Sequence, residues 1–153
     1  MQVNVISGNN LPLLKQMKSQ SFSLIYIDPP FNTGKRQRLH DNSYEDSFAT
    51  SADYIKWLRR RIRQAHRLLD QRGSIFVHCD SREAHYIKIM LDEVFGRVNF
   101  RNEIIWAYDY GGRSKKIWSR KHDTIFWYSK TSDFKYNYNA IDRIPYMLSL
   151  IHI

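Results

Sequence analysis

Apolar residues along this chain fall into short runs that alternate with segments of helical spacing. The runs at residues 23–27 and 74–78 are bounded by turn-forming residues, and such runs predict buried strands. Two further strand-like runs lie at 103–108 and 124–128, with a glycine-containing basic loop and no helical segment between them. Their closeness predicts an antiparallel hairpin. Residues 3–6 are expected to form another short strand.

Three segments show the spacing of helices. Residues 9–17 predict a short helix with a proline near its first turn, where proline is tolerated. A capping-box sequence at 50–53 starts a long helix that we expect to reach about Asp70, with Gly73 stopping it. Its apolar stripe consists of Leu58, Ile62, Ala65 and Leu69. The third helix ends at Gly96, and its apolar positions are Ala84, Ile87, Leu91 and Val94.

Strands that alternate with helices favour an α/β fold with a mostly parallel sheet, and the hairpin adds an antiparallel pair at one edge. Residues 32–50 are polar without a period and are expected to form a mobile loop. With 153 residues, the chain is long enough for one domain with its own core, which we assign to residues 1–147. The last six residues, 148–153, match a translated sequencing-library adapter and are expected to be a non-native tail.

Composition narrows the classes of partner. A net charge of +9 and a pI of about 9.7 favour a polyanion such as nucleic acid, although a basic surface without that role gives the same charge. The apolar content of 42% is typical of a soluble protein, and we expect neither a membrane span nor a signal peptide. The single cysteine, Cys79, excludes an internal disulfide and fits a reducing cytoplasm. The scattered histidines predict no metal site.

The sequence LIYIDPPFNTG, residues 24–34, ends a predicted strand with an acid and two prolines. Ligands of open α/β sheets lie beyond the carboxyl ends of the strands, and Asp28 is at such an end. Each proline holds the residue before it in an extended geometry, so Asp28 and Pro29 point in set directions, and Pro30 adds a second fixed φ. Phe31 follows on a loop. These residues predict a site for a planar group that carries an amine, although Asp-Pro-Pro alone can simply end a strand.

An exocyclic amine of a nucleobase is a poor nucleophile because its lone pair is delocalised into the ring. The carboxylate of Asp28 and the carbonyl of Pro29 can each accept one amine hydrogen, which frees the lone pair and stabilises the positive charge that develops on nitrogen. Phe31 can stack on the base, with a contribution of about 1–3 kcal/mol. A carboxylate is too weak a base to deprotonate the amine first, so we assign Asp28 an orienting and electrostatic role.

The same motif resembles the catalytic motif of amino-group DNA methyltransferases, which act on adenine N6 or cytosine N4. Segments 73–96 and 99–130 are similar to the following segments of that family, so the resemblance covers residues 8–146. The acid of DPPF is more typical of the adenine enzymes, whereas cytosine-N4 enzymes more often carry serine there. The resemblance implies a Rossmann-like fold, S-adenosylmethionine as methyl donor, and a flipped-out base of double-stranded DNA as substrate. It also implies a prokaryotic or phage source, and it is compatible with a cognate restriction endonuclease as partner.

The family binds its methyl donor with a glycine-rich loop of the form Asp-Pro-Phe-x-Gly-x-Gly, and residues 1–153 contain no such loop. The order of the segments implies the family's beta arrangement, in which this loop follows the catalytic motif. The region that carries target recognition is expected beyond about residue 146. We therefore interpret residues 1–147 as a partial catalytic domain, and we expect it to be inactive alone.

Other candidates lie near the motif. Residues 32–34 are expected to shape a loop that closes over the base, with a simple turn as the alternative. His78 and Asp80 end the second buried strand at the same edge as Asp28, and the resemblance places this edge beside the base or cofactor pocket. Cys79 points to the opposite face from His78, so no catalytic pair of these two is expected. The candidates adjacent to the base or cofactor are Asn32, Thr33, Gly34, His78 and Asp80.

Two basic segments are candidates for DNA contact. The loop 111–123 combines glycines and cations with Trp118, and its alternative is a solvated hairpin loop. Its predicted phosphate contacts are Arg113, Lys115, Lys116, Arg120 and Lys121. Segment 56–67 is also basic, but its arginines fall mainly off the apolar stripe, so an ordinary surface helix is favoured there.

The leading interpretation is a DNA methyltransferase specific for adenine N6. Methylation of cytosine N4, or of an RNA base, on the same scaffold is the first alternative, and assays on matched DNA and RNA separate them. The second alternative is a DNA-binding remnant without catalysis, which binds duplex DNA with a steep salt dependence and has no affinity for the methyl donor.

Overall fold

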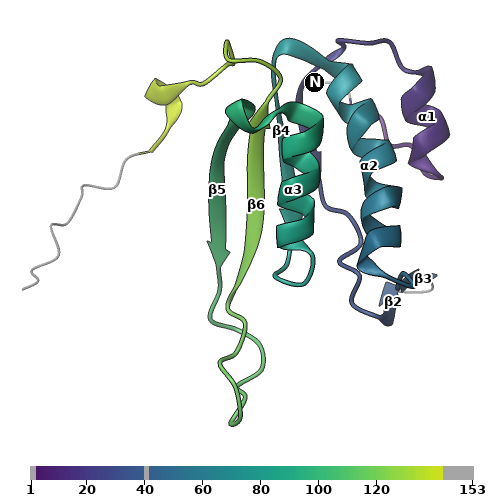
Figure 1. Cartoon of the computed structure of the whole chain (residues 1–153), viewed down its shortest axis with the longest axis vertical. Coiled ribbons are helices and arrows are strands. Elements are labelled where there is room, and N and C mark those ends of the chain that lie inside the picture. Colours follow the sequence, from purple (N-terminus) through teal and green to yellow (C-terminus); the bar gives the residue numbers. More distant parts are fainter. Residues whose placement is uncertain (1–2, 40–41, 143–153) are drawn as a thin grey trace, which may run out of the picture.

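The computed structural model describes residues 3–39 and 42–142 (Figure 1). Its helices are α1 (Asn10–Gln16), α2 (Ser51–Leu68) and α3 (Ala84–Phe95). Its strands are β1 (Phe22–Ile27), β2 (Lys35–Leu39), β3 (Asn42–Asp46), β4 (Leu69–Cys79), β5 (Phe100–Ala107) and β6 (His122–Ser129). Short 3-10 turns lie at Arg97–Asn99 and Tyr138–Ala140. The predicted tail at 148–153 lies outside the described residues.

Four strands form the main sheet, in the order β1-β4-β6-β5. β1 is parallel to β4, with Ile25 beside Ile75, whereas β6 is antiparallel to both β4 and β5. The α/β class and the antiparallel hairpin at one edge are confirmed. The described sheet is mixed, with one parallel and two antiparallel pairings, because β6 enters between β4 and β5.

α2 and α3 cover one face of this sheet, and α1 lies beside α2 (Figure 1). α2 starts as predicted, because Thr50 Oγ1 accepts a hydrogen bond of 3.1 Å from Asp53 N. Three residues of the predicted stripe, Leu58, Ile62 and Ala65, are buried in α2 and share one core cluster with strand β4. The fourth, Leu69, is also buried but is the first residue of β4. α3 ends at Gly96, as predicted. Among the described residues, no helix has both the length and the apolar character that a membrane crossing requires.

The opposite face of the sheet carries exposed apolar side chains. Leu24 and Tyr26 of β1 are 59% and 54% exposed, and Ile104 and Trp106 of β5 are 37% and 57% exposed. Strand residues alternate between faces, and Ile25 packs against the core under the helices. The described part of the chain therefore buries one face of the sheet and leaves much of the other face to solvent.

Three sequence expectations about strands were wrong. β1 is mostly exposed rather than buried, because in the described sheet it pairs with a strand on one side only. Residues 3–6 are exposed and form no strand. Residues 32–50 contain the β2–β3 hairpin instead of a mobile loop, with Arg36 paired to Glu45. Its charged residues conceal the alternation that would indicate a strand.

The junction between α2 and β4 also differs from the prediction. The helix ends at Leu68, and the chain enters β4 directly at Leu69. Gly73 therefore lies within β4 rather than stopping the helix. A Cβ atom at this position would lie 2.9 Å from Leu69 Cδ2 and 3.2 Å from the carbonyl oxygen of Phe22. The glycine permits this close approach of β1 to β4.

Candidate functional site

Segments with candidate residues meet at one edge of the main sheet. Because β1 and β4 are parallel, Asp28 follows β1 at the same edge where His78 and Cys79 end β4 and Asp80 follows it. Because β6 is antiparallel to β4 and β5, the connection at 108–121 leaves that edge as well. The fold therefore brings the motif at residues 28–31, the end of β4 and the basic loop to one side of the molecule.

Asp28 presents its carboxylate to solvent with a side chain that is 63% exposed. Pro29 is buried behind it, and Pro30 and Phe31 are half-buried. A cavity of about 420 Å³ opens at this point and is lined by Asp28, Pro29, Pro30, Phe31, Thr33, Gln37 and Asp46. The four residues predicted to be catalytic thus line one concave site.

The loop after the motif is fixed by Asp46, which the sequence analysis did not identify. Its side chain is 2% exposed and accepts hydrogen bonds from Asn32 N (2.8 Å), Thr33 N (3.2 Å) and Thr33 Oγ1 (2.6 Å). The carbonyl of Asp46 accepts a further bond of 2.9 Å from Gly34 N. Asn32 has a φ of +54°, and these bonds hold it there. The segment 32–34 is therefore a hydrogen-bonded turn in this structure.

A second buried acid, Glu83, anchors the same turn from the start of α3. Its side chain is 4% exposed, and Oε1 accepts bonds from Asn32 Nδ2 at 2.7 Å and Ser51 Oγ at 2.9 Å. Asn32 Oδ1 accepts in turn from Phe48 N at 2.9 Å. Neither acid has a sequence signal of its own, because both contacts join segments that are far apart in the chain.

His78 lies beside the Asp28 carboxylate, at the edge where the sequence places both residues. Its Nδ1 is 3.8 Å from Asp28 Oδ1 and 3.2 Å from the Tyr26 hydroxyl. The Phe31 ring meets the imidazole edge-on, with ring centroids 5.5 Å apart. Burial and the charge of Asp28 raise the pKa of Tyr26, so its hydroxyl stays protonated and can donate. The imidazole thus contacts Tyr26, which precedes Asp28 in the sequence, and Phe31, which follows it.

The other nitrogen of His78 faces Asp123, a further residue that the sequence analysis missed. His78 Nε2 is 3.4 Å from Asp123 Oδ2, and Asp123 Oδ1 accepts a bond of 3.3 Å from the Tyr108 hydroxyl. Burial and Asp123 raise the pKa of Tyr108, which keeps this donor protonated. The antiparallel pairing of β4 with β6 places Asp123 here, so a sequence signal existed only once that pairing was known.

Asp80 and Cys79 have structural contacts. The buried Asp80 carboxylate accepts a hydrogen bond of 2.9 Å from Arg82 N and forms an ion pair with the Arg82 guanidinium. The backbone carbonyl of Asp80 accepts a hydrogen bond from Ala84 N. Asp80 thereby shapes the turn into α3 and does not line the cavity at Asp28. The Cys79 thiol is buried in the core, and burial, with smaller effects of Asp123 and Glu103, raises its pKa to about 12. Cys79 is therefore not a nucleophile.

The basic loop projects past the ends of the helices (Figure 1). Four of its five predicted phosphate contacts are exposed: Arg113, Lys115, Lys116 and Arg120. The fifth, Lys121, is half-buried and donates from Nζ to the carbonyl oxygens of Asp109 at 3.0 Å and Tyr110 at 2.9 Å. It braces the base of the loop.

The basic face of α2 is partly occupied by contacts with α1. Arg61 stacks over the Trp57 ring at 3.8 Å and donates to Asn10 Oδ1 at 2.9 Å. Arg67 donates to the carbonyl oxygens of Leu14 at 2.7 Å and Met17 at 2.9 Å. These two arginines tie α1 to α2, in agreement with a structural role for this segment.

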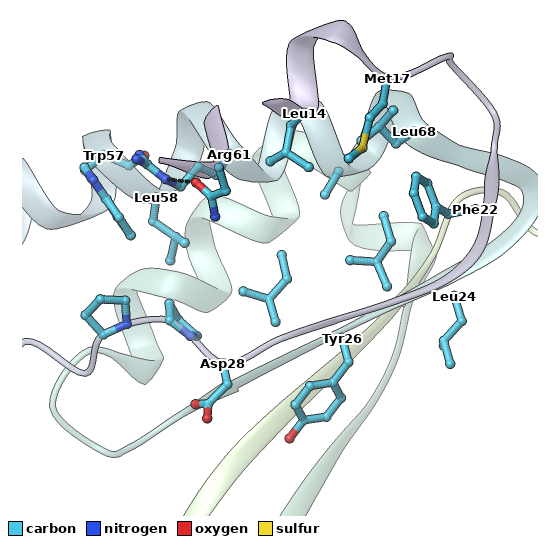
Figure 2. Close-up of a pocket in the computed structure, with 16 residues that line it drawn as sticks. Leu14, Met17, Phe22, Leu24, Tyr26, Asp28, Trp57, Leu58, Arg61 and Leu68 are labelled. Carbon is cyan, nitrogen blue, oxygen red and sulfur yellow. Dashed lines mark hydrogen bonds between the residues drawn. The ribbon is translucent and has the colours of Figure 1, made fainter. Parts of the chain in front are cut away.

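A second cavity, of about 520 Å³, lies between β1, α1 and α2 and reaches Asp28 (Figure 2). Its walls are mostly apolar, with Leu14, Leu58 and Leu68 among them, and Arg61 is the charged residue on the α2 side. Burial lowers the pKa of the Arg61 guanidinium. Figure 2 shows the Asp28 carboxylate on the same side of β1 as Tyr26, away from the helices. In the part of the chain that the structure describes, no group of three or more His, Cys, Asp or Glu side chains is placed to hold a metal ion.

Comparison with known proteins shows which family the chain belongs to. A family described as DNA methylase, which comprises N6 and N4 methyltransferases, matches residues 22–146. The type II methyltransferase M.EcaI of Enterobacter cloacae is 34% identical over 86% of the chain, and the DNA adenine methyltransferase YhdJ of Escherichia coli is 29% identical over 90%. The chain spans 30% and 45% of the lengths of these two relatives.

Solved structures show the same fold at low sequence identity. The PvuII DNA methyltransferase, which is cytosine-N4-specific, aligns with a TM-score of 0.61 at 18% identity, over 83% of this chain and 48% of its own. M1.HpyAVI in complex with SAM aligns with a TM-score of 0.53 at 16% identity, over 88% of this chain and 57% of its own. The match across residues 22–146 decides the family: this chain belongs to the N6/N4 DNA methylases.

Proposed function

We propose that this chain contains the catalytic site of a DNA methyltransferase that methylates adenine at N6. The observation that carries the proposal is the exposed Asp28 carboxylate at the end of β1, in a cavity that Pro29, Pro30 and Phe31 also line. The acid in the motif and the name of YhdJ favour adenine. Similarity to the PvuII enzyme favours cytosine N4 as the second candidate, because that enzyme is cytosine-N4-specific.

In the proposed reaction, an Asp28 carboxylate oxygen and the Pro29 carbonyl oxygen each accept a hydrogen bond from the target amine. The nitrogen lone pair then attacks the methyl group, so a C–N bond forms while the S–C bond of the donor breaks. The nitrogen afterwards loses one proton, for which solvent at the exposed Asp28 side chain gives a route. Phe31 stacks on the base and holds the ring in place.

The turn at 32–34 gives this site its rigidity. Asp46 and Glu83 fix Asn32 and Thr33 through hydrogen bonds, so the preceding motif is held between β1 and an anchored turn. A preorganised acceptor stabilises developing charge without reorganising at the moment of reaction. His78 supports the Asp28 side of the site through its contact with the carboxylate, and the Tyr26 hydroxyl contacts His78 in turn.

S-adenosylmethionine, when bound, supplies the methyl group. The cavity of about 520 Å³ at β1 has the size of a small-molecule site and reaches Asp28, which makes its lining a candidate wall for the donor. On the helix side of this wall, Trp57, Arg61 and Asn10 can stack or hydrogen-bond. They supply part of a donor site, because the glycine-rich loop that the resemblance requires is absent from residues 1–153.

For double-stranded DNA, the exposed cations of the basic loop supply the phosphate contacts, since they extend from the same edge as Asp28. A restriction endonuclease as partner stays a prediction from the resemblance.

The test is a methylation assay with the protein encoded by the full native gene, unmethylated duplex DNA and labelled methyl donor. Digestion to nucleosides is expected to give N6-methyladenine, and N4-methylcytosine would support the second candidate. Asp28→Ala is expected to abolish transfer and leave DNA binding largely intact. Asp133→Ala is the matched control, because Asp133 is an exposed acid beyond the opposite end of β6. Turnover by Asp28→Ala would remove Asp28 from its role.

A further inference from the structure

The tip of the basic loop carries two of the most exposed apolar side chains in the described structure. Trp118 is 100% exposed, and its neighbour Ile117 is 74% exposed. Tryptophan buries most of its large surface in globular proteins, so a fully exposed one calls for a partner surface. Neither residue belongs to the predicted phosphate contacts.

The loop presents this tip on an ordered turn. Ser114 Oγ accepts bonds from Lys116 N at 3.1 Å and from Ile117 N at 3.2 Å, and Ser119 Oγ accepts from Ser114 N at 3.0 Å. At the base, Lys121 donates to two backbone carbonyls of the loop. The backbone is thus held on both sides of the tip while the two apolar side chains face solvent.

The charge around the tip selects the class of partner. Residues 111–122 contain five Lys or Arg residues and no acid. A partner must therefore combine a dense negative charge with an apolar interior that a flat ring can enter. Duplex DNA has both, in its phosphates and its base stack, and apolar side chains set among cations are the means by which proteins unstack base steps.

The position of the loop relates the tip to the proposed chemistry. The loop leaves the sheet at the edge where Asp28 lies, and Tyr108 at its base is linked through Asp123 to His78. His78 contacts Asp28. The tip is therefore carried by an element that is hydrogen-bonded to the catalytic edge.

We propose that Trp118, supported by Ile117, is a wedge that enters the base stack of duplex DNA beside the base that turns towards Asp28. The inference rests on the proposed function, because it assumes DNA as the bound partner. Lys115, Lys116 and Arg120 hold the flanking phosphates while the indole ring occupies the opened step. The wedge offsets part of the cost of unstacking the target base.

The test measures unstacking directly and needs no methyl donor. The full chain is titrated onto a duplex that carries 2-aminopurine in a mismatched pair, where unstacking costs least. We expect the wild-type chain to raise the 2-aminopurine fluorescence several-fold. Trp118→Ala is expected to abolish this rise and weaken binding about tenfold, whereas Trp118→Phe retains most of both.

Val98→Ala is the control, because Val98 is 84% exposed and lies at the opposite edge, after α3. It should change neither quantity, and circular dichroism should show that Trp118→Ala folds like the wild type. A wild-type chain that gives no fluorescence rise, or a Trp118→Ala variant that matches the wild type in rise and affinity, overturns the wedge. A normal rise with no methyl transfer by the native protein counts against the proposed function and leaves the wedge supported.

Discussion

The acidic residues around the candidate site differ sharply in burial. This difference distinguishes the acid that can contact a substrate from the acids that hold the surrounding loop. The Asp28 side chain is 63% exposed and faces the cavity. Asp46 and Glu83 are 2% and 4% exposed. Both carboxylate oxygens of Asp46 and Oε1 of Glu83 accept hydrogen bonds from the turn that follows the motif, whereas Glu83 Oε2 has no hydrogen-bond partner among the described residues. An exposed acceptor can receive a substrate amine, whereas a buried carboxylate that accepts hydrogen bonds from the loop holds that loop in place.

Asp46→Ala is expected to destabilise the fold by about 2–4 kcal/mol, because it leaves two backbone donors and the Thr33 hydroxyl without their acceptor. Urea unfolding followed by circular dichroism measures the change. Glu45→Ala is the matched control, since Glu45 is the exposed neighbour on β3, and it should cost less than about 0.5 kcal/mol. Equal effects of the two substitutions would show that Asp46 does not anchor the turn.

Cys79 gives a prediction about alkaline pH. Its thiol pKa is about 12 in the folded protein against an ordinary value of 9.0, so between these values the unfolded state binds fewer protons than the folded state. Stability must therefore fall as pH rises through this window, by up to about 1.4 kcal/mol per pH unit. The unfolding free energy of Cys79→Ala should fall less steeply between pH 9 and 11. Unfolding also exposes buried tyrosines, which lowers stability at high pH in the wild type and in Cys79→Ala alike. Equal slopes of unfolding free energy against pH for the two proteins would therefore contradict a contribution of the thiol.

At the scale of helices and strands, the sequence predicted the elements whose cause is local. The apolar stripe and the Thr50 cap specify α2, and the apolar run at 74–78 specifies the core of β4. β2 and β3 were missed because their stability comes from pairing with each other and from the bonds that Asp46 makes to the preceding turn. The exposure of β1 was missed because burial depends on which strands lie beside it.

The candidate site shows the same division. The motif identified Asp28 to Phe31, since proline geometry and an acid at a strand end are visible in one short segment. Asp46, Glu83 and Asp123 depend on contacts across 14, 51 and 45 positions of the chain. Such contacts exist only once the topology is known, so no local pattern reveals them.

The loop between β5 and β6 gives a prediction for a whole element. Replacing Arg113, Lys115, Lys116 and Arg120 together by Gln should lower the slope of log K against log salt by about four for duplex DNA. The comparison is a set of three exposed cations on α2, Lys56, Arg60 and Arg63, replaced in the same way. Titrations at several salt concentrations measure both slopes. A larger drop from the α2 set would assign the DNA contact to that helix instead.

For the molecule as a whole, the distribution of apolar surface decides how residues 1–153 behave in isolation. The helices cover one face of the sheet, while Leu24, Tyr26, Ile104 and Trp106 expose apolar surface on the other. Among the described strands, β1 forms backbone hydrogen bonds with β4 alone, so its other edge has no paired strand. An apolar sheet face next to an unpaired strand edge is a surface on which copies of a chain associate.

We therefore expect residues 1–153 to be marginally stable and to self-associate, with a melting temperature and a sedimentation coefficient that depend on protein concentration. Leu24→Lys combined with Ile104→Lys should suppress the association, because charges on that face oppose stacking of two sheets. Val98→Lys places the same charge at an exposed position outside the sheet and should leave association unchanged. A monomer that melts cooperatively at high temperature would show that the described half-covered sheet is sufficient, because its single buried face would then supply the whole folding free energy.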